Sequence, residues 1–87
     1  MAHLRLPPTL PPLFADLPRR LDVEAPTVVD AITQLDEQWP GLLDRLCERG
    51  PTLRQHIHVY VDGRRADLDS ALGEGSRVDV IAAISGG

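Results

Sequence analysis

Two stretches near the start of the chain alternate apolar and polar residues, the period of two that is typical of a strand with one buried face. The inward residues are Leu4 and Leu6 in residues 2–6, and Leu21 and Val23 in residues 19–25. Between them, the sequence PPTLPPLFADLP holds five prolines, which prevent regular pairing and helix formation alike. The pattern therefore predicts a β-hairpin closed by a long loop.

The apolar period then changes to that of a helix, in the sequence TVVDAITQLDEQW. Thr27 is a preferred N-cap residue, and Asp30 three positions later can complete a capping box. The apolar residues at helical spacing are Val28, Val29, Ile32, Leu35 and Trp39. Pro40 is predicted to start a second helical stretch, which ends at Gly50 and Pro51.

The last third of the chain returns to strand patterns. Residues 57–61 alternate, and Asp62-Gly63 is the kind of dipeptide that forms a two-residue hairpin turn into a short, weaker strand. The final segment, RVDVIAAI, is apolar at nearly every position from Val78 on. That pattern is typical of a central strand covered on both faces.

The predicted order is strand, strand, helix, strand, short strand, strand, in one domain (residues 1–83) followed by a flexible tail (residues 84–87). A helix that follows a hairpin and returns the chain to a final strand beside the first gives a mixed sheet. We expect four to five strands with one main helix across one face, which is the α+β arrangement called β-grasp, or ubiquitin-like.

Composition narrows the class of function. Thirteen acidic residues outnumber nine basic ones, giving a net charge of −4, so the sequence argues against nucleic-acid or membrane partners and favours basic ones. No apolar run approaches the roughly 18 residues that span a bilayer. The single cysteine, Cys47, cannot form an internal disulfide, and no signal-peptide pattern opens the chain, so a cytoplasmic location is expected.

The side chains offer little catalytic chemistry. His56 and His58 share one strand face, as a metal-binding pair would, but zinc needs three or four ligands and spacing supplies no third, so no metal is expected. Cys47 is expected as a small, partly buried hydrophobic residue on the second helical stretch, with a nucleophile as the alternative. A free-standing enzyme is not expected from a fold with so little room for a pocket.

The chain ends in Ser85, Gly86 and Gly87, directly after an apolar strand. Ordering a residue costs about 1–2 kcal/mol, and glycine loses the most freedom, so two glycines make sense where a side chain would block a narrow channel in another protein. The reactive group is then the α-carboxylate of Gly87, carried roughly 13 Å beyond the last strand on an extended tail. A frayed terminus without a role is the alternative.

Four segments, in this order along the chain, together carry a family resemblance: TVVDAITQLDEQWPGLLDRL, IHVYVDGRRADL, LGEGSRVDVI and the terminal SGG. With them, the chain resembles the MoaD/ThiS family of ubiquitin-like sulfur carriers across nearly its whole length. Within that family, LRQHIHVYVDG and the early PTL look closest to carriers that serve cysteine biosynthesis.

The resemblance implies a carrier and not an enzyme, although such a carrier can form the small subunit of molybdopterin synthase. A partner adenylyltransferase, of the type related to ubiquitin-activating enzymes, would use ATP and Mg²⁺ to adenylate Gly87; this chain itself binds no cofactor. A sulfur donor would then displace AMP. The resulting thiocarboxylate would pass sulfur to a synthase of molybdopterin, cysteine or thio-metabolite formation. The alternatives are a protein modifier joined to targets through Gly87 and a non-catalytic interaction module.

Partner docking is expected on the sheet face opposite the helix. If alternate residues of the last strand from Val78 face the core, Ile81 and Ala83 point outward and leave an apolar patch of the kind that marks interfaces. Ile81 and Ile84 are expected to anchor the contact nearest the tail, and packing of Ile81 under a loop is the alternative. The predicted partner-binding residues are Tyr60, Ile81, Ala83 and Ile84.

Overall fold

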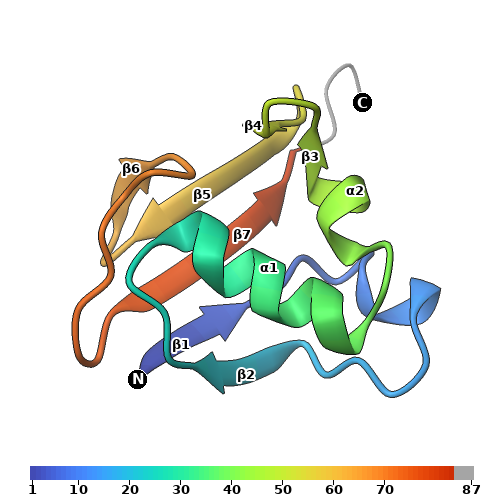
Figure 1. Cartoon of the computed structure of the whole chain (residues 1–87), viewed down its shortest axis with the longest axis horizontal. Coiled ribbons are helices and arrows are strands. Elements are labelled where there is room, and N and C mark those ends of the chain that lie inside the picture. Colours follow the sequence, from blue (N-terminus) through green and yellow to red (C-terminus); the bar gives the residue numbers. More distant parts are fainter. Residues whose placement is uncertain (84–87) are drawn as a thin grey trace.

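The computed structural model describes residues 1–83, which form a five-stranded mixed sheet with helices on one face (Figure 1). The strands, in spatial order, are β2 (Arg20–Val23), β1 (Ala2–Arg5), β7 (Arg77–Ala82), β5 (Ile57–Val61) and β6 (Arg64–Ala66). β1 and β7 run parallel, and the other neighbours are antiparallel. This is the predicted β-grasp fold, and its last strand lies at the centre as expected.

The main helix, α1 (Val28–Gln38), begins at the predicted N-cap. The Thr27 hydroxyl accepts a hydrogen bond from the Asp30 backbone N–H at 3.3 Å and donates one to the Asp30 carboxylate at 2.7 Å. Trp39 ends the helix, and its indole N–H donates to the carbonyl of Ala15 in the proline-rich loop at 2.9 Å. The helix is therefore tied at its end to the loop that joins the first two strands.

The second helix is shorter than predicted. α2 (Leu42–Leu46) is followed at once by the strand β3 (Cys47–Glu48), which pairs with β4 (Thr52–Leu53). Arg54 explains the early end, because its backbone N–H donates to the Leu46 carbonyl at 3.0 Å and its Nε donates to the Asp44 carbonyl at 2.7 Å. Carbonyls that another helical turn would have satisfied are therefore already bonded. The prediction that Cys47 lies on a helix is wrong, although the residue is buried.

The core lies between the sheet and the helices, and it is almost wholly aliphatic. Its largest fully buried side chains are Leu4, Leu6, Ile32, Leu35, Leu42, Leu46, Val28, Val59 and Val78. The proline-rich loop also contributes, since Leu10 and Leu17 are buried on either side of a short 3-10 helix, η1 (Pro11–Leu13). The loop is thus packed onto the domain rather than extended from it.

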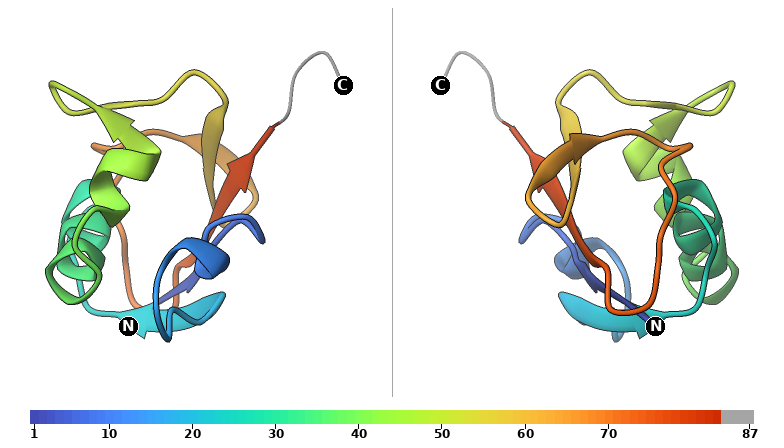
Figure 2. Two further views of the ribbon diagram at one scale, coloured as in Figure 1. Left: turned by 90° about the vertical axis from the view of Figure 1, so that its right-hand side faces the viewer. Right: turned by 90° about the vertical axis from the view of Figure 1, so that its left-hand side faces the viewer.

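The helices cover only one face of the sheet, as the two side views show (Figure 2). Val78 and Val80 on β7 are buried against the core. Ile81, the next residue after Val80, is 43% exposed. The prediction that the last strand is covered on both faces is therefore wrong for the described residues. The strand β7 is apolar at nearly every position because it also carries an apolar side chain, Ile81, on the face that no helix covers.

The β5–β6 hairpin has the predicted two-residue turn. Asp62 and Gly63 have φ values of 52° and 83°, so both occupy the left-handed region that this turn requires. The Asp62 carboxylate also accepts a hydrogen bond from the backbone N–H of Arg77 at 2.9 Å. The turn thereby fixes the start of β7 and the register of β5 against β6. The predicted tail, residues 84–87, lies outside the described residues.

Candidate functional site

The predicted site residues divide at Ala83. Ile84, Ser85, Gly86 and Gly87 lie outside the described residues, so the structure shows the surface from which they continue. Ala83 follows the central strand directly, and its backbone N–H donates to the His56 carbonyl at 2.7 Å. This bond extends the pairing with β5 by one residue beyond β7. The sheet therefore fixes the point at which the terminal segment begins.

The open face near this point carries the predicted outward residues. Ile81 and His58 are register partners on β7 and β5, and Tyr60 lies two residues further along β5 opposite Asp79. Tyr60 and Ala83 are half-buried, and Ile81 is one of the large hydrophobic side chains that remain exposed in residues 1–83. The structure thus brings Tyr60 and Ile81 to one surface beside Ala83.

Tyr60 and Ile81 line a shared groove of about 410 Å³ on this face. Pro7 and Pro8, which follow β1 after Leu6, also line it. Because β1 runs parallel to β7, these prolines lie beside the C-terminal end of β7. Ile81 is therefore on the wall of an open groove and not packed under a loop.

Arg65 on β6 contacts Tyr60, which lines the groove, and sequence reasoning missed it. Its guanidinium lies 6.0 Å from the centroid of the Tyr60 ring, within cation–π range, and its Nη2 is 2.6 Å from His58 Nδ1. A guanidinium can only donate, so His58 Nδ1 is the acceptor in this contact. The two-residue turn was the signal for this contact, because it makes Tyr60 and Arg65 cross-strand partners.

The other candidate chemistry from the sequence is placed as follows. Cys47 is 3% exposed, and burial raises the pKa of its thiol above the ordinary 9.0 while the charge of Arg54 opposes that shift. The thiol is therefore protonated near neutral pH, and it has little nucleophilic character. Residues 1–83 contain no group of three or more histidine, cysteine, aspartate or glutamate side chains arranged to hold a metal ion. In the same residues, no helix is long and apolar enough to cross a membrane.

Solved structures share this architecture. CysO of Amycolatopsis orientalis, in a complex with BexX, is 20% identical with a TM-score of 0.85, and the match covers 100% of both chains. CysO of Mycobacterium tuberculosis is 19% identical with a TM-score of 0.83, covering 97% of this chain and 100% of that one. SAMP1 of Haloferax volcanii is 31% identical with a TM-score of 0.68, covering 99% and 98%. The curated proteins include no significant match.

Fold and neighbours together define a ubiquitin-like protein of the β-grasp class. The ThiS family model matches residues 13–87, and the chain therefore belongs to the ThiS family, whose members are ubiquitin-like sulfur carriers. The family match begins in the proline-rich loop and leaves out β1, which the structural matches include. It extends through Gly87, so the terminal glycine pair is part of the matched pattern. The resemblance noted in the sequence is confirmed.

Proposed function

We propose that this chain is a sulfur carrier whose Gly87 carboxylate is adenylated by a partner enzyme and then converted to a thiocarboxylate. One observation carries the proposal: the ThiS family match extends to Gly87. The fold supports it as well, because β7 leads the chain to Ala83 at the edge of an open apolar groove. A partner that binds this groove would meet the terminal segment at the residue where it leaves the sheet.

The chemistry follows from the weakness of a carboxylate as an electrophile. A carboxylate oxygen of Gly87 attacks the α-phosphorus of ATP in the partner, and Mg²⁺-bound pyrophosphate leaves. Hydrosulfide then attacks the carbonyl carbon of the acyl-adenylate. The new C–S bond replaces the C–O bond to AMP, and one proton is released. The thiocarboxylate is an ionised nucleophile at pH 7, so it can attack an acceptor bound in another enzyme.

The proposed partner surface consists of Tyr60, Ile81, Ala83 and Ile84. The first three lie together on the described face, and Ile84 follows directly in the sequence. We propose two partners for this surface, an adenylyltransferase of the type related to ubiquitin-activating enzymes and a sulfur-accepting synthase. The synthase would serve molybdopterin formation, or cysteine or thio-metabolite formation. The solved complex of CysO with BexX shows that a protein of this fold assembles with another protein.

A second candidate function, protein modification through Gly87, is favoured by a specific comparison. SAMP1, which is 31% identical, is a small archaeal modifier protein. A modifier would be joined to lysine side chains of its targets through the same activated carboxylate. This chain contains no lysine, so it presents no ε-amine on which a further copy could be attached. Conjugates of this chain would therefore carry single copies rather than chains built on its own lysines.

Exchange of radiolabelled pyrophosphate into ATP tests the activation step. We expect the full chain to stimulate exchange by its adenylyltransferase in the presence of Mg²⁺. A chain that ends at Gly86, and a chain with one bulky residue added after Gly87, should both fail, because neither presents the same carboxylate on the same length of tail. Equal exchange with either altered chain would contradict the proposal.

A further inference from the structure

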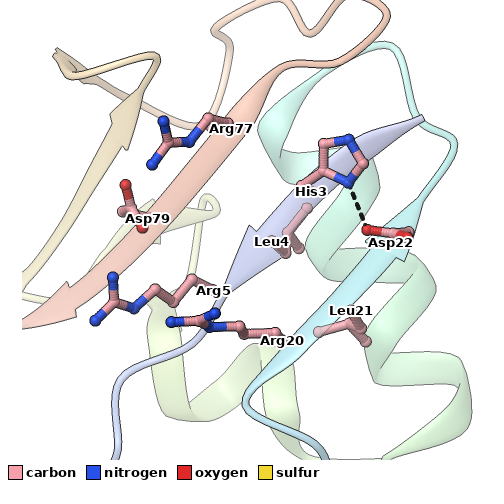
Figure 3. Close-up of a pocket in the computed structure, with 8 residues that line it drawn as sticks. All are labelled: His3, Leu4, Arg5, Arg20, Leu21, Asp22, Arg77 and Asp79. Atoms are coloured by element: carbon pink, nitrogen blue, oxygen red, sulfur yellow. Dashed lines mark hydrogen bonds and ion pairs between the residues drawn. The ribbon is translucent and has the colours of Figure 1, made fainter.

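Beyond the apolar groove, the same open face carries three arginines that we call the arginine face: Arg5 on β1, Arg20 on β2 and Arg77 on β7 (Figure 3). They line a second hollow of about 440 Å³. Arg5 and Asp79 line both hollows, so the two are contiguous. The open face therefore changes from apolar near the chain end to cationic further along the sheet.

The charge of this face is opposite in sign to that of the whole chain. Its strands carry Arg5, Arg20, Arg65 and Arg77 against Asp22 and Asp79, an excess of two positive charges, whereas the chain carries −4. Arg19 and Asp62 line the adjoining hollows and add one charge of each sign, so the excess is unchanged. Asp22 is already engaged, since its carboxylate lies 2.6 Å from His3 Nδ1. The acidic majority lies elsewhere on the molecule.

Two members of the arginine face are held in an unfavourable arrangement. Arg5 and Arg20 are direct register partners on antiparallel strands, and both are exposed (Figure 3). Within residues 1–83, neither side chain nor that of Arg77 makes an ion pair or hydrogen bond of its own. Like charges directly opposite each other destabilise a sheet. A partner that supplies carboxylates at this position would relieve that repulsion as it binds.

We propose that the arginine face binds acidic side chains of the protein that docks on the apolar groove. This inference rests on the proposed function and deepens it by naming the partner's chemistry: an apolar side chain beside Ile81, and carboxylates about 13 Å away at the level of Arg77, four strand residues along β7. Guanidinium groups suit carboxylates because they donate paired hydrogen bonds. The net charge of the chain favours a basic partner, whereas the charge of this face favours an acidic one.

A protein partner fits this surface better than a nucleic acid. Asp79 lies in the same row as Arg5 and would repel an evenly charged phosphate backbone. The adjoining groove, with Pro7, Tyr60 and Ile81 on its walls, matches an apolar side chain, and its two arginines, Arg5 and Arg19, share it with the carboxylate of Asp79. An extended partner segment with both kinds of side chain would complement the whole face: its apolar side chains fit the groove, and its acidic side chains fit the arginine face.

A titration of the full chain tests the surface without any assumption about function. The probe is a short synthetic peptide with glutamates flanking a central leucine, added to isotopically labelled protein and followed by NMR. We expect shifts of the backbone signals of Arg5, Arg20, Arg77 and Ile81, and loss of the shifts in high salt. A lysine peptide of the same length and a short single-stranded RNA are the comparisons. The proposal is overturned if the acidic peptide leaves these signals unmoved, or if either comparison binds this face as tightly.

Charge reversal tests the same surface in the assembled complex. The double variant Arg5→Glu, Arg20→Glu keeps two like charges opposite each other but brings a carboxylate into the row of Asp79, so urea unfolding first checks that the variant is folded. We expect it to weaken binding to the adenylyltransferase about 10- to 100-fold in 50 mM NaCl and much less in 500 mM, where the screening length is about 4 Å. The control is Arg45→Glu, Arg49→Glu, which reverses two exposed arginines away from the open face and should leave affinity unchanged.

The outcomes separate this inference from the function on which it rests. If the Arg5, Arg20 reversal binds like the original chain while Ile81→Asp does not, the arginine face is overturned and the carrier function stands. An equal loss in the control pair also overturns it, because the effect would then follow net charge. If pyrophosphate exchange does not depend on Gly87, the proposed function fails, and the peptide titration alone still decides the surface.

Discussion

Replacing Ile81 by aspartate should abolish partner binding while leaving the domain folded. The side chain lies on the open face of β7 and is 43% exposed, so the core does not depend on it. Burying a whole isoleucine side chain contributes about 1.5–3 kcal/mol, and burial of the exposed 43% by a partner therefore contributes about 1 kcal/mol. An unpaired carboxylate at the same position adds a desolvation cost of about 2–3 kcal/mol or more.

These two effects together predict an affinity at least about 100-fold weaker, since each 1.4 kcal/mol is a factor of ten. Ile81→Thr is the matched control, because threonine is also β-branched and uncharged. It should lose only the contact, about fivefold in affinity. Both variants should unfold within about 1 kcal/mol of the original chain, the range of strand propensities. The measurements are isothermal titration calorimetry with the adenylyltransferase and urea unfolding followed by circular dichroism.

Two results would refute this reasoning. The first is unimpaired binding and adenylation of the aspartate variant, which would show that the partner does not cover Ile81. The second is a loss of folding stability as large as the loss of binding energy. In that case Ile81 would contribute to the fold and not to an interface.

Three further predictions concern the fold itself. Gly63→Ala should cost about 1 kcal/mol in urea unfolding, because φ is 83° while no atom lies within 4 Å of the added methyl; an unchanged midpoint would contradict this. Arg20→Glu should stabilise the chain by about 0.5 kcal/mol, since it turns a like-charge pair with Arg5 into an opposite-charge pair; a lower melting temperature would count against the register. Because burial raises the pKa of Cys47 above 9.0, the unfolded chain releases that proton first, so the free energy of unfolding should fall as pH rises beyond about 9 and should fall less in Cys47→Ala. Equal slopes for the two chains above that pH would disprove this role of the thiol.

The elements that sequence patterns predicted well are those set by local chemistry. Alternation in residues 2–6 identifies β1, the hydroxyl of Thr27 marks the start of α1, and Asp62-Gly63 dictates a two-residue turn. Each depends on residues within a few positions of one another. The register of β5 against β6, and with it the contact between Tyr60 and Arg65, follows from that turn.

The features that the sequence could not predict depend on distant residues. The end of α2 is decided by Arg54, which bonds to the helix carbonyls from beyond the β3–β4 turn. The opposition of Arg5 and Arg20 depends on how the long proline-rich loop closes. Alternation from Val78 predicted that Ile81 points outward, but an apolar run in β7 has the same appearance whether or not its outer residues are covered, so only the structure shows that Ile81 is exposed. The net charge of the chain likewise does not show how charged side chains are distributed over its surface, so the sequence did not predict the arginine face.

The central claim is that the carboxylate of Gly87 accepts sulfur, and intact-mass spectrometry tests it most directly. The full chain is incubated with its adenylyltransferase, ATP, Mg²⁺ and sulfide, alongside a chain that ends at Gly86. The account predicts that the full chain gains the mass difference between sulfur and oxygen, that the gain depends on ATP, and that fragmentation locates it at Gly87. An unchanged mass with an enzyme shown to adenylate the chain would contradict the account, as would a product joined only to lysines of other proteins.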